Sequence, residues 1–170
     1  MVPLWIAMCV TALVAQTLPA SSVPYVPTTP AIVDAMLKAA NVTKRDVVYD
    51  LGCGDGRIVI AAAKQYGAHG VGVDIDPDRI AEARANAKAA GVENLVTFRV
   101  EDLFQTNLKD ATVVTLYLLP SVNKRLMPKL RSELKKGARV VSNSFDMGDA
   151  WPADLRVPIE NTAIFLWKIQ

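Results

Sequence analysis

Asp46-Val-Val-Tyr-Asp-Leu-Gly-Cys-Gly-Asp-Gly-Arg-Ile-Val-Ile60 is the stretch of sequence that decides the fold. It predicts a short buried strand over 47–51, then a tight turn, then a helix. Gly52, Gly54 and Gly56 allow the turn to adopt positive φ and let a ligand approach the backbone. A strand, a glycine turn and a helix in this order form the first unit of a doubly wound nucleotide-binding sheet. A glycine loop alone would also fit a purely structural turn.

The acidic residues of this stretch argue against a dinucleotide. A dinucleotide fingerprint needs glycine at position 57, where the chain has Arg57. Asp50 ends the strand and Asp55 lies in the turn, so two carboxylates would crowd a pyrophosphate. S-adenosyl-L-methionine carries an ammonium and a sulfonium and no phosphate, so it suits these charges better. The D-x-G-x-G-x-G spacing that ends at Gly56 resembles motif I of class I, seven-strand methyltransferases, and a dinucleotide oxidoreductase becomes a distant alternative.

Further acidic residues follow the next two predicted strands. The strand predicted over 70–75 contains Asp74, about 20 residues past the glycines, where a carboxylate can accept both ribose hydroxyls. Ile75 beside it is placed to pack on the adenine face. Asp102 and its neighbour Leu103 follow the third strand. In class I methyltransferases an acidic residue at this position takes the adenine amino group, although Asp102 can also serve as a helix N-cap.

The rest of the chain completes a recognisable sheet. Residues 112–119 are almost continuously apolar and predict a central strand, and residues 138–143 predict a fifth strand. Residues 156–160 and 163–169 predict a closing antiparallel pair. The expected fold is therefore α/β, a Rossmann-like seven-strand sheet, mostly parallel with a C-terminal antiparallel strand pair, and with helices on both faces.

The end of the central strand bears on the acceptor of the methyl group. Tyr117 stands there without the Asn/Asp-Pro-Pro-aromatic motif of enzymes that methylate bases or glutamine amides, which disfavours such substrates. We expect Ser121 to cap the long helix that follows. Its basic residues could hold RNA or anionic lipid, but a net charge of only +2 favours a solvated face, so no nucleic acid partner is favoured.

Cysteine and histidine are too few for a metal site or a disulfide framework. The chain has two cysteines, Cys9 and Cys53, and a single histidine, His69. We therefore expect no metal. Cys53 is either a reactive thiol or, as we favour, a small filler of the glycine loop.

The N-terminal part predicts a separate leader. Residues 1–20 are an apolar leader, and no charged side chain occurs in residues 1–33. Because S-adenosylmethionine is made inside cells, we favour an uncleaved membrane anchor with the catalytic domain (31–170) on the donor side. Export after signal cleavage, or a cytoplasmic protein with a mis-assigned start, are the alternatives. The proline-rich segment 21–30 is either a linker or a lid that brings Tyr25 and Thr28 over the donor.

A narrower family resemblance covers nearly everything from residue 23 to residue 169. The chain resembles the small lysine methyltransferases that modify the mitochondrial adenine nucleotide translocase and the c subunit of ATP synthase. Two departures are Asp74, where those enzymes usually have glutamate, and Cys53, where serine is commoner. The resemblance is carried, in order, by Val23-Pro-Tyr-Val-Pro27, Asp50-Leu-Gly-Cys-Gly-Asp-Gly-Arg-Ile-Val-Ile60, Leu119-Pro-Ser-Val122 and Gly137-Ala-Arg-Val-Val-Ser142, and by a late strand that contains tryptophan.

The resemblance implies a protein-lysine N-methyltransferase that uses S-adenosyl-L-methionine, releases S-adenosyl-L-homocysteine and acts on a membrane-associated protein. A small-molecule or RNA methyltransferase, or a non-catalytic donor-binding factor, are the alternatives. We expect Tyr117 to position the acceptor amine at an apolar mouth, which favours the neutral amine by desolvation. The oligomeric state is not predicted.

Overall fold

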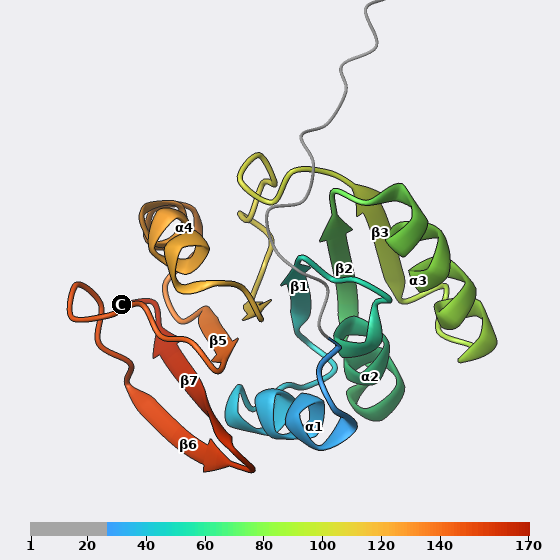
Figure 1. Ribbon diagram of the computed structural model, residues 1–170. Helices are drawn as coiled ribbons and strands as arrows, with labels where there is room; N and C mark the ends of the chain where they lie inside the picture. Colours follow the sequence, from blue (N-terminus) through green and yellow to red (C-terminus); the bar gives the residue numbers. More distant parts are fainter. Residues whose placement is uncertain (1–26) are drawn as a thin grey trace, which may run out of the picture.

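The predicted first strand forms β1 (Val47–Leu51), which lies inside a seven-stranded sheet in the computed structural model, where residues 27–170 are described (Figure 1). The strand order is β3-β2-β1-β4-β5-β7-β6. Strands β1 to β5 are mutually parallel, whereas β7 is antiparallel to both β5 and β6. The other strands are β2 (His69–Asp74), β3 (Val96–Val100), β4 (Val113–Leu116), β5 (Arg139–Asn143), β6 (Leu155–Ile159) and β7 (Thr162–Lys168).

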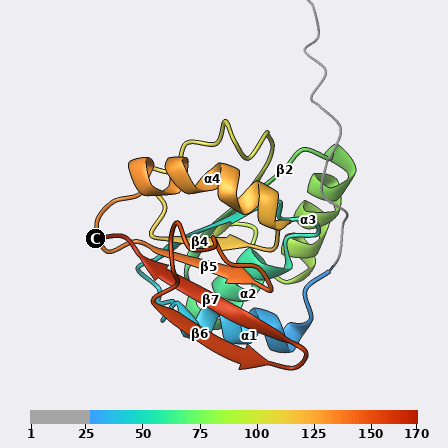
Figure 2. The same cartoon turned by 60° about the vertical axis from the view of Figure 1, so that its left-hand side comes forward.

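Helices cover both faces of the sheet, as the sequence predicts (Figures 1 and 2). On one face lie α1 (Pro30–Ala39), α2 (Arg57–Tyr66) and α3 (Pro77–Ala89). On the other lies α4 (Pro120–Glu133), together with the long connection between β3 and β4. The expected α/β fold with a C-terminal antiparallel pair is therefore confirmed.

Alternation along the strands divides the core into two layers. Val48 packs with α1, α2 and α3, whereas its neighbour Tyr49 packs with α4. The same division holds for Val113 and Val114 of β4. Successive side chains of a strand point to opposite faces, so these nearly continuous apolar runs serve a sheet that is buried on both sides.

Two helices begin with a capping side chain followed by proline. Thr29 caps α1, its hydroxyl accepting the Ile32 N–H, and Pro30 takes the first helical position. Asp76 and Pro77 begin α3 in the same way. Proline fits this position because it lacks the N–H that a helix start would leave unpaired.

The start of α4 differs from the prediction. Strand β4 ends at Leu116, three residues before position 119, and Leu119 rather than Ser121 stands at the N-cap. The reason is the neighbouring strand. Leu116 pairs with Leu51, where β1 also ends, so residues beyond Leu116 have no partner backbone on that side.

Candidate functional site

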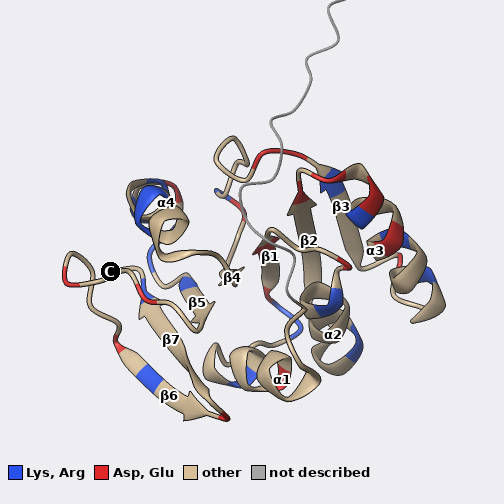
Figure 3. Cartoon of the chain, in the orientation of Figure 1, with Lys and Arg blue, Asp and Glu red and all other residues tan. Residues whose placement is uncertain are grey.

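The carboxyl ends of the parallel strands meet at one edge of the sheet, and acidic residues gather there. Asp50 lies near the end of β1, Asp74 ends β2, and Asp102 follows β3. Figure 3 shows the acidic colour at the tips of β1 and β2 and in the segment after β3. Ligands of open α/β sheets bind in the crevice outside these strand ends, so this edge is the candidate site.

The glycine turn has the backbone shape that its sequence predicts. Gly52, Gly54 and Gly56 all adopt positive φ, at 84°, 52° and 79°. The N–H groups of Gly52 and Cys53 both donate to the carbonyl oxygen of Val73, which fastens the turn to β2. Gly52 itself is exposed, so its backbone is open to a ligand.

Gly56 also serves a packing need. A Cβ at this position would lie 2.6 Å from the ring of Phe98. Contacts that short do not occur, so only glycine lets the turn pack this closely on the side chain from β3. Its role in the turn therefore combines backbone conformation with packing, and its assignment to the donor site stays a prediction.

Asp50 is a buried carboxyl group with an unusual titration. It is 3% exposed and accepts a hydrogen bond of 2.7 Å from the hydroxyl of Thr115 in β4. Burial raises the pKa of Asp50 to about 7, and the negative charges of Asp74 and Asp55 act in the same direction against the Thr115 hydrogen bond. A cation placed beside Asp50 would stabilise its ionised form.

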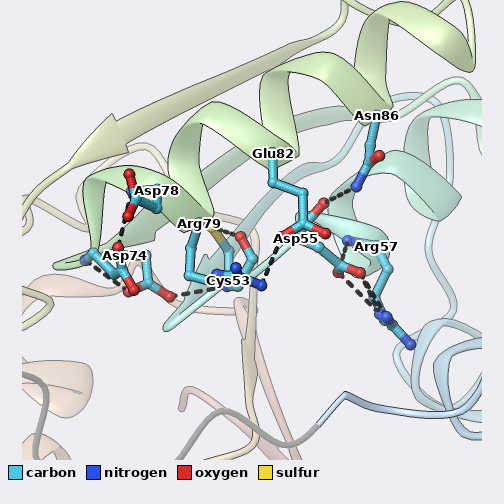
Figure 4. A network of polar contacts seen from close by, with 10 residues as sticks. Cys53, Asp55, Arg57, Asp74, Asp78, Arg79, Glu82 and Asn86 are labelled. Carbon is cyan, nitrogen blue, oxygen red and sulfur yellow. Dashed lines mark hydrogen bonds and ion pairs between the residues drawn. The ribbon is translucent and has the colours of Figure 1, made fainter.

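Asp74 is held in place by the backbone and keeps capacity for a ligand. Its two carboxylate oxygens accept the N–H groups of Gly54, at 2.9 Å, and Asp76, at 3.0 Å (Figure 4). A carboxylate offers about four acceptor positions. About two therefore remain, which is what a pair of ribose hydroxyls requires. Ile75 follows directly and is half-buried.

Asp102 caps a turn and not a helix, and it keeps one oxygen available for a ligand. Its Oδ1 accepts the Phe104 N–H at 2.9 Å and so stabilises the turn after β3. No hydrogen bond to Oδ2 occurs within residues 27–170, so this oxygen can accept from an amino group. Leu103 next to it is half-buried and packs against the α4 side of the core.

The sequence did not predict that Asp55 is paired with a neighbouring arginine. Its carboxylate does not add an uncompensated charge at the ligand edge, because the guanidinium of Arg57 binds it, with a distance of 2.9 Å from Nε to Oδ1 (Figure 4). Asn86 of α3 donates to its backbone carbonyl oxygen at 3.1 Å. The acidic character of the site therefore rests on Asp50, Asp74 and Asp102.

Arg57 also ties the segment before α1 to the glycine loop. Its Nη1 donates to the carbonyl oxygen of Thr28 at 2.7 Å, and Thr28 is 5% exposed. The segment thus passes beside the loop, as a lid would require. Tyr25, the other predicted lid residue, lies outside the described residues, as do residues 1–20.

Tyr117, the predicted acceptor-side residue, stands beyond the end of β4. It is half-buried, and Leu118 beside it packs over Gly52, with Cδ2 3.1 Å from the point that a Cβ would occupy there. Leu119 is 38% exposed. This rim is apolar, as expected. His69 lies at the opposite edge, because it pairs with Val47 at the amino end of β1.

Three further features concern a cysteine, potential metal ligands and membrane-spanning helices. Cys53 is buried, and that burial raises the pKa of its thiol, so it is an inert filler of the loop rather than a nucleophile. Residues 27–170 contain no group of three or more potential metal ligands. Within the same residues, no helix has the length and apolar character needed to cross a bilayer.

Sequence reasoning missed Thr115 as a partner of Asp50 and Arg57 as a tether of Thr28. The sequence does indicate that Thr115 is unusual, since it is a hydroxyl residue inside the apolar run of β4. A fully buried hydroxyl needs a hydrogen-bond partner. The tether between Arg57 and Thr28 joins positions 29 residues apart and left no signal in the sequence.

The residues present fit S-adenosylmethionine. The exposed backbone of Gly52 is open to a ligand, Asp74 has acceptor capacity for hydroxyls, Asp102 has an open oxygen, and the buried Asp50 gains from a neighbouring cation. A diphosphate would instead meet several carboxylates, which repel it.

Comparisons with known proteins agree with this chemistry. Residues 50–154 match the family model of the ANTKMT methyltransferase domain. The chain is 49% identical over 152 residues to a protein-lysine N-methyltransferase of Saccharolobus islandicus, covering 86% of this chain and 94% of the relative. It is 36% identical over 135 residues to a lysine N-methyltransferase of Xenopus laevis that is named for the C subunit of ATP synthase, covering 79% of this chain and 59% of that relative.

A solved structure is also similar. The crystal structure of an RNA methyltransferase from Salinibacter ruber in complex with S-adenosyl-L-homocysteine has a TM-score of 0.83 and 55% sequence identity. The match covers 85% of this chain and 94% of that chain. These similarities agree with the ligand that the residues at the sheet edge fit. The chain therefore belongs to the ANTKMT methyltransferase family and is an S-adenosylmethionine-dependent methyltransferase.

Proposed function

We propose that this methyltransferase modifies the ε-amino group of a lysine in a protein. The observation that carries the proposal is the 49% identity to a protein-lysine N-methyltransferase over 94% of that relative's length. The apolar rim at Tyr117, Leu118 and Leu119 supports it. A lysine amine has a pKa of about 10.4 and must lose a proton before it attacks, and desolvation at an apolar rim favours the neutral form.

We assign each residue of the site a proposed role from its position. Asp50, Asp74 and Asp102 hold the donor, with the exposed backbone of Gly52 as its floor, Gly54 and Gly56 as the packed part of that turn, and Ile75, Leu103 and Thr28 as its sides. When bound, the donor supplies an electrophilic methyl group for direct in-line displacement. Tyr117 orients the amine. Because the only histidine, His69, lies at the opposite edge, the proton of the amine leaves to water.

RNA is the second candidate acceptor, because the Salinibacter ruber protein of 55% identity is described as an RNA methyltransferase. Transfer from tritiated S-adenosylmethionine into an extract of cells that lack this protein separates the candidates. We expect label in the protein pool, recovered as methylated lysine after acid hydrolysis. Label that is destroyed by ribonuclease would favour RNA. Label in the soluble pool would indicate that the acceptor is a small molecule. The absence of label from every pool would indicate a non-catalytic donor-binding factor.

The acceptor class and the place of action are linked in the proposal. Relatives named for the C subunit of ATP synthase and for the adenine nucleotide translocase support a membrane-associated substrate. We propose that residues 1–20 anchor the protein with the domain on the side that holds the donor. Alkaline extraction of membranes, followed by mass spectrometry of the N-terminus, tests this. A soluble protein, or a terminus cleaved near residue 20, would contradict the anchor.

A further inference from the structure

A buried polar cluster lies at the carboxyl end of β5, beside the rim where an acceptor enters. At its centre is Asn123, in the first turns of α4, with no exposed surface. Its Nδ2 donates to the hydroxyl of Ser142 at 3.3 Å and to the carbonyl oxygen of Phe145 at 3.2 Å. One side chain thus connects α4, the end of β5 and the loop 144–154 that follows β5.

Folding stability explains an amide at this position only in part. The Oδ1 of Asn123 is buried and has no hydrogen-bond partner within the described residues, which is unfavourable. Its Nδ2 satisfies the Ser142 hydroxyl and the Phe145 carbonyl oxygen, but both bonds are long, so they stabilise the fold only modestly. Their clearer effect is to fix the loop after β5 against α4.

The loop that Asn123 holds begins in a strained conformation. Ser144 has φ of 67°, and the Phe145 N–H donates to the carbonyl oxygen of Asn143 at 2.8 Å, which makes a γ-turn of the rare form. The Ser144 hydroxyl lies 2.7 Å from that of Thr162 in β7 and 3.1 Å from Oδ1 of Asn143. Such strain persists only where surrounding contacts impose it, and it clusters at functional sites.

The position of this cluster connects it with methyl transfer. Leu116 pairs with both Leu51 and Ser142, so Tyr117 and the loop after β5 leave the sheet at the same edge. The backbone N–H of Asn123 donates to the carbonyl oxygen of Leu119, so its helix turn is continuous with the rim. The donor half of the site is formed from the other side, by β1, β2 and β3.

We propose that Asn123 is a positioning residue for the methyl acceptor. It fixes the loop 144–154 against the rim 117–119 and so sets the shape of the acceptor side without contacting the donor. The inference rests on methyl transfer from S-adenosylmethionine and not on the class of acceptor.

The decisive variant is Asn123→Leu, which keeps the branched shape with larger end groups and removes both the amide bonds and the unpaired oxygen. We expect it to fold with a melting temperature somewhat below the wild-type value, because Ser142 and Phe145 lose a donor, and to bind S-adenosylhomocysteine with the wild-type Kd. We expect the KM for acceptor to rise about tenfold, because misplacement at a reacting site is costly. Ser132→Ala is the control, since this residue of α4 bonds only within its own helix, and should leave all three values unchanged.

The acceptor probe is the extract of cells that lack this protein, titrated with tritiated donor, and the KM is measured in whichever pool takes label. Label in RNA would therefore refute the lysine proposal without affecting this inference. A wild-type KM in Asn123→Leu, or a weakened donor Kd, would overturn the inference. If Asn123→Leu fails to fold, Ser144→Gly replaces it. This variant relieves the backbone strain and removes the hydroxyl that contacts Thr162, so the acceptor KM must rise while the donor Kd stays unchanged. A wild-type acceptor KM in Ser144→Gly would also overturn the inference.

Discussion

Asp50 has a carboxyl group whose burial affects stability and, by the proposal above, donor binding. Burial in the core of the sheet raises the pKa of its carboxyl group from 3.8 to about 7. In the protein without donor, ionisation of Asp50 therefore opposes folding. The penalty is absent below about pH 4, grows as the pH rises, and is complete above about pH 7. A cation bound beside Asp50 would offset this penalty. Binding of a cationic donor would therefore be stronger by the free energy that ionisation of Asp50 costs the donor-free protein.

The first prediction concerns stability. Asp50→Asn should be more stable than the wild type at about pH 8 when no donor is present, by up to roughly 4 kcal/mol, because the amide carries no charge to bury. The difference should disappear near pH 4, about the ordinary pKa of the group. Urea denaturation of both proteins across this pH range measures it, and a difference that does not change with pH would contradict the assignment.

The second prediction concerns donor binding. If only ionised Asp50 attracts the cationic donor, wild-type affinity for S-adenosylmethionine should be about tenfold lower at about pH 6 than at about pH 8. Asp50→Asn should bind more weakly and lack this dependence. Calorimetry on both proteins is the measurement. The donor's own titration affects both proteins equally, so it cancels when the wild-type affinity is divided by the affinity of Asp50→Asn. If that ratio were the same at every pH, Asp50 would be excluded from the donor site.

The third prediction separates two requirements for glycine. Gly56→Ala should lower stability by about 3 kcal/mol or more, because its Cβ would lie 2.6 Å from Phe98 in addition to the cost of φ at 79°. Gly91→Ala is the matched control. Gly91 has φ of 68° but nothing within 4 Å, so only the backbone cost of about 1 kcal/mol applies. Equal losses in chemical denaturation would show that packing on Phe98 does not matter.

At the scale of elements, β1, β4 and β5 are joined at the edge opposite to the site. Asp46, just before β1, accepts a hydrogen bond of 2.7 Å from the hydroxyl of Thr112, and Arg139 of β5 pairs with the same oxygen. Its other oxygen accepts the Thr43 N–H at 2.8 Å. These contacts hold the central strands in one register, which in turn aligns their carboxyl ends at the site.

The fourth prediction tests this cluster. Burial by itself would raise the pKa of Asp46, but the hydrogen bonds from Thr112 and Thr43 and the guanidinium opposite outweigh it and hold the pKa below its usual value. The ionised form therefore stabilises the fold above about pH 4, and this contribution is lost as the pH falls. Asp46→Asn should lose about 3 kcal/mol at about pH 7, because it leaves a charge without its partner.

The measurement for Asp46→Asn is denaturation as a function of pH. The gap between variant and wild type should shrink from about pH 7 towards about pH 3 as the wild-type carboxylate is protonated. Donor affinity at neutral pH should stay close to the wild-type value, since the cluster lies at the far edge. A gap that is the same at every pH would mean that Asp46 contributes through shape and not through charge.

At the scale of the whole molecule, the sheet brings two half-sites together. The proposed donor residues come from β1, β2 and the segment after β3, and the proposed acceptor rim comes from β4 and the loop after β5. The crossover in strand order between β1 and β4 separates the two halves and opens the crevice between them.

The fifth prediction follows from the charge of that crevice. S-adenosyl-L-homocysteine should raise the melting temperature, by an amount equivalent to roughly 3 kcal/mol at about a hundred times its Kd, whereas NADH at the same concentration should not. Carboxylates at the strand ends repel a pyrophosphate but accept an ammonium group. Thermal melts with each ligand decide it, and stabilisation by NADH alone would refute the ligand assignment.

Local order in the chain was enough to predict the fold and the backbone of the glycine turn. Val47–Leu51, the glycines and Asp74 lie within one strand–turn–helix–strand unit, where neighbours in sequence are neighbours in space. The predicted positive φ values and the bounds of β1 agree with the structure, whereas β2 lies one residue earlier than predicted. The start of α4 was misjudged because it depends on where β1 stops, about 65 residues earlier in the chain.

The sequence by itself therefore determined the ligand chemistry: glycines and carboxylates recur at strand ends, and parallel strands must bring those ends to one edge. Only the tertiary structure decided which charges are compensated. It paired Asp55 with Arg57, buried Asp50 against Thr115, and left Oδ1 of Asn123 without a partner in the described chain. The physical reason is that pKa and hydrogen-bond satisfaction depend on distance and burial, which are set by residues far apart in sequence.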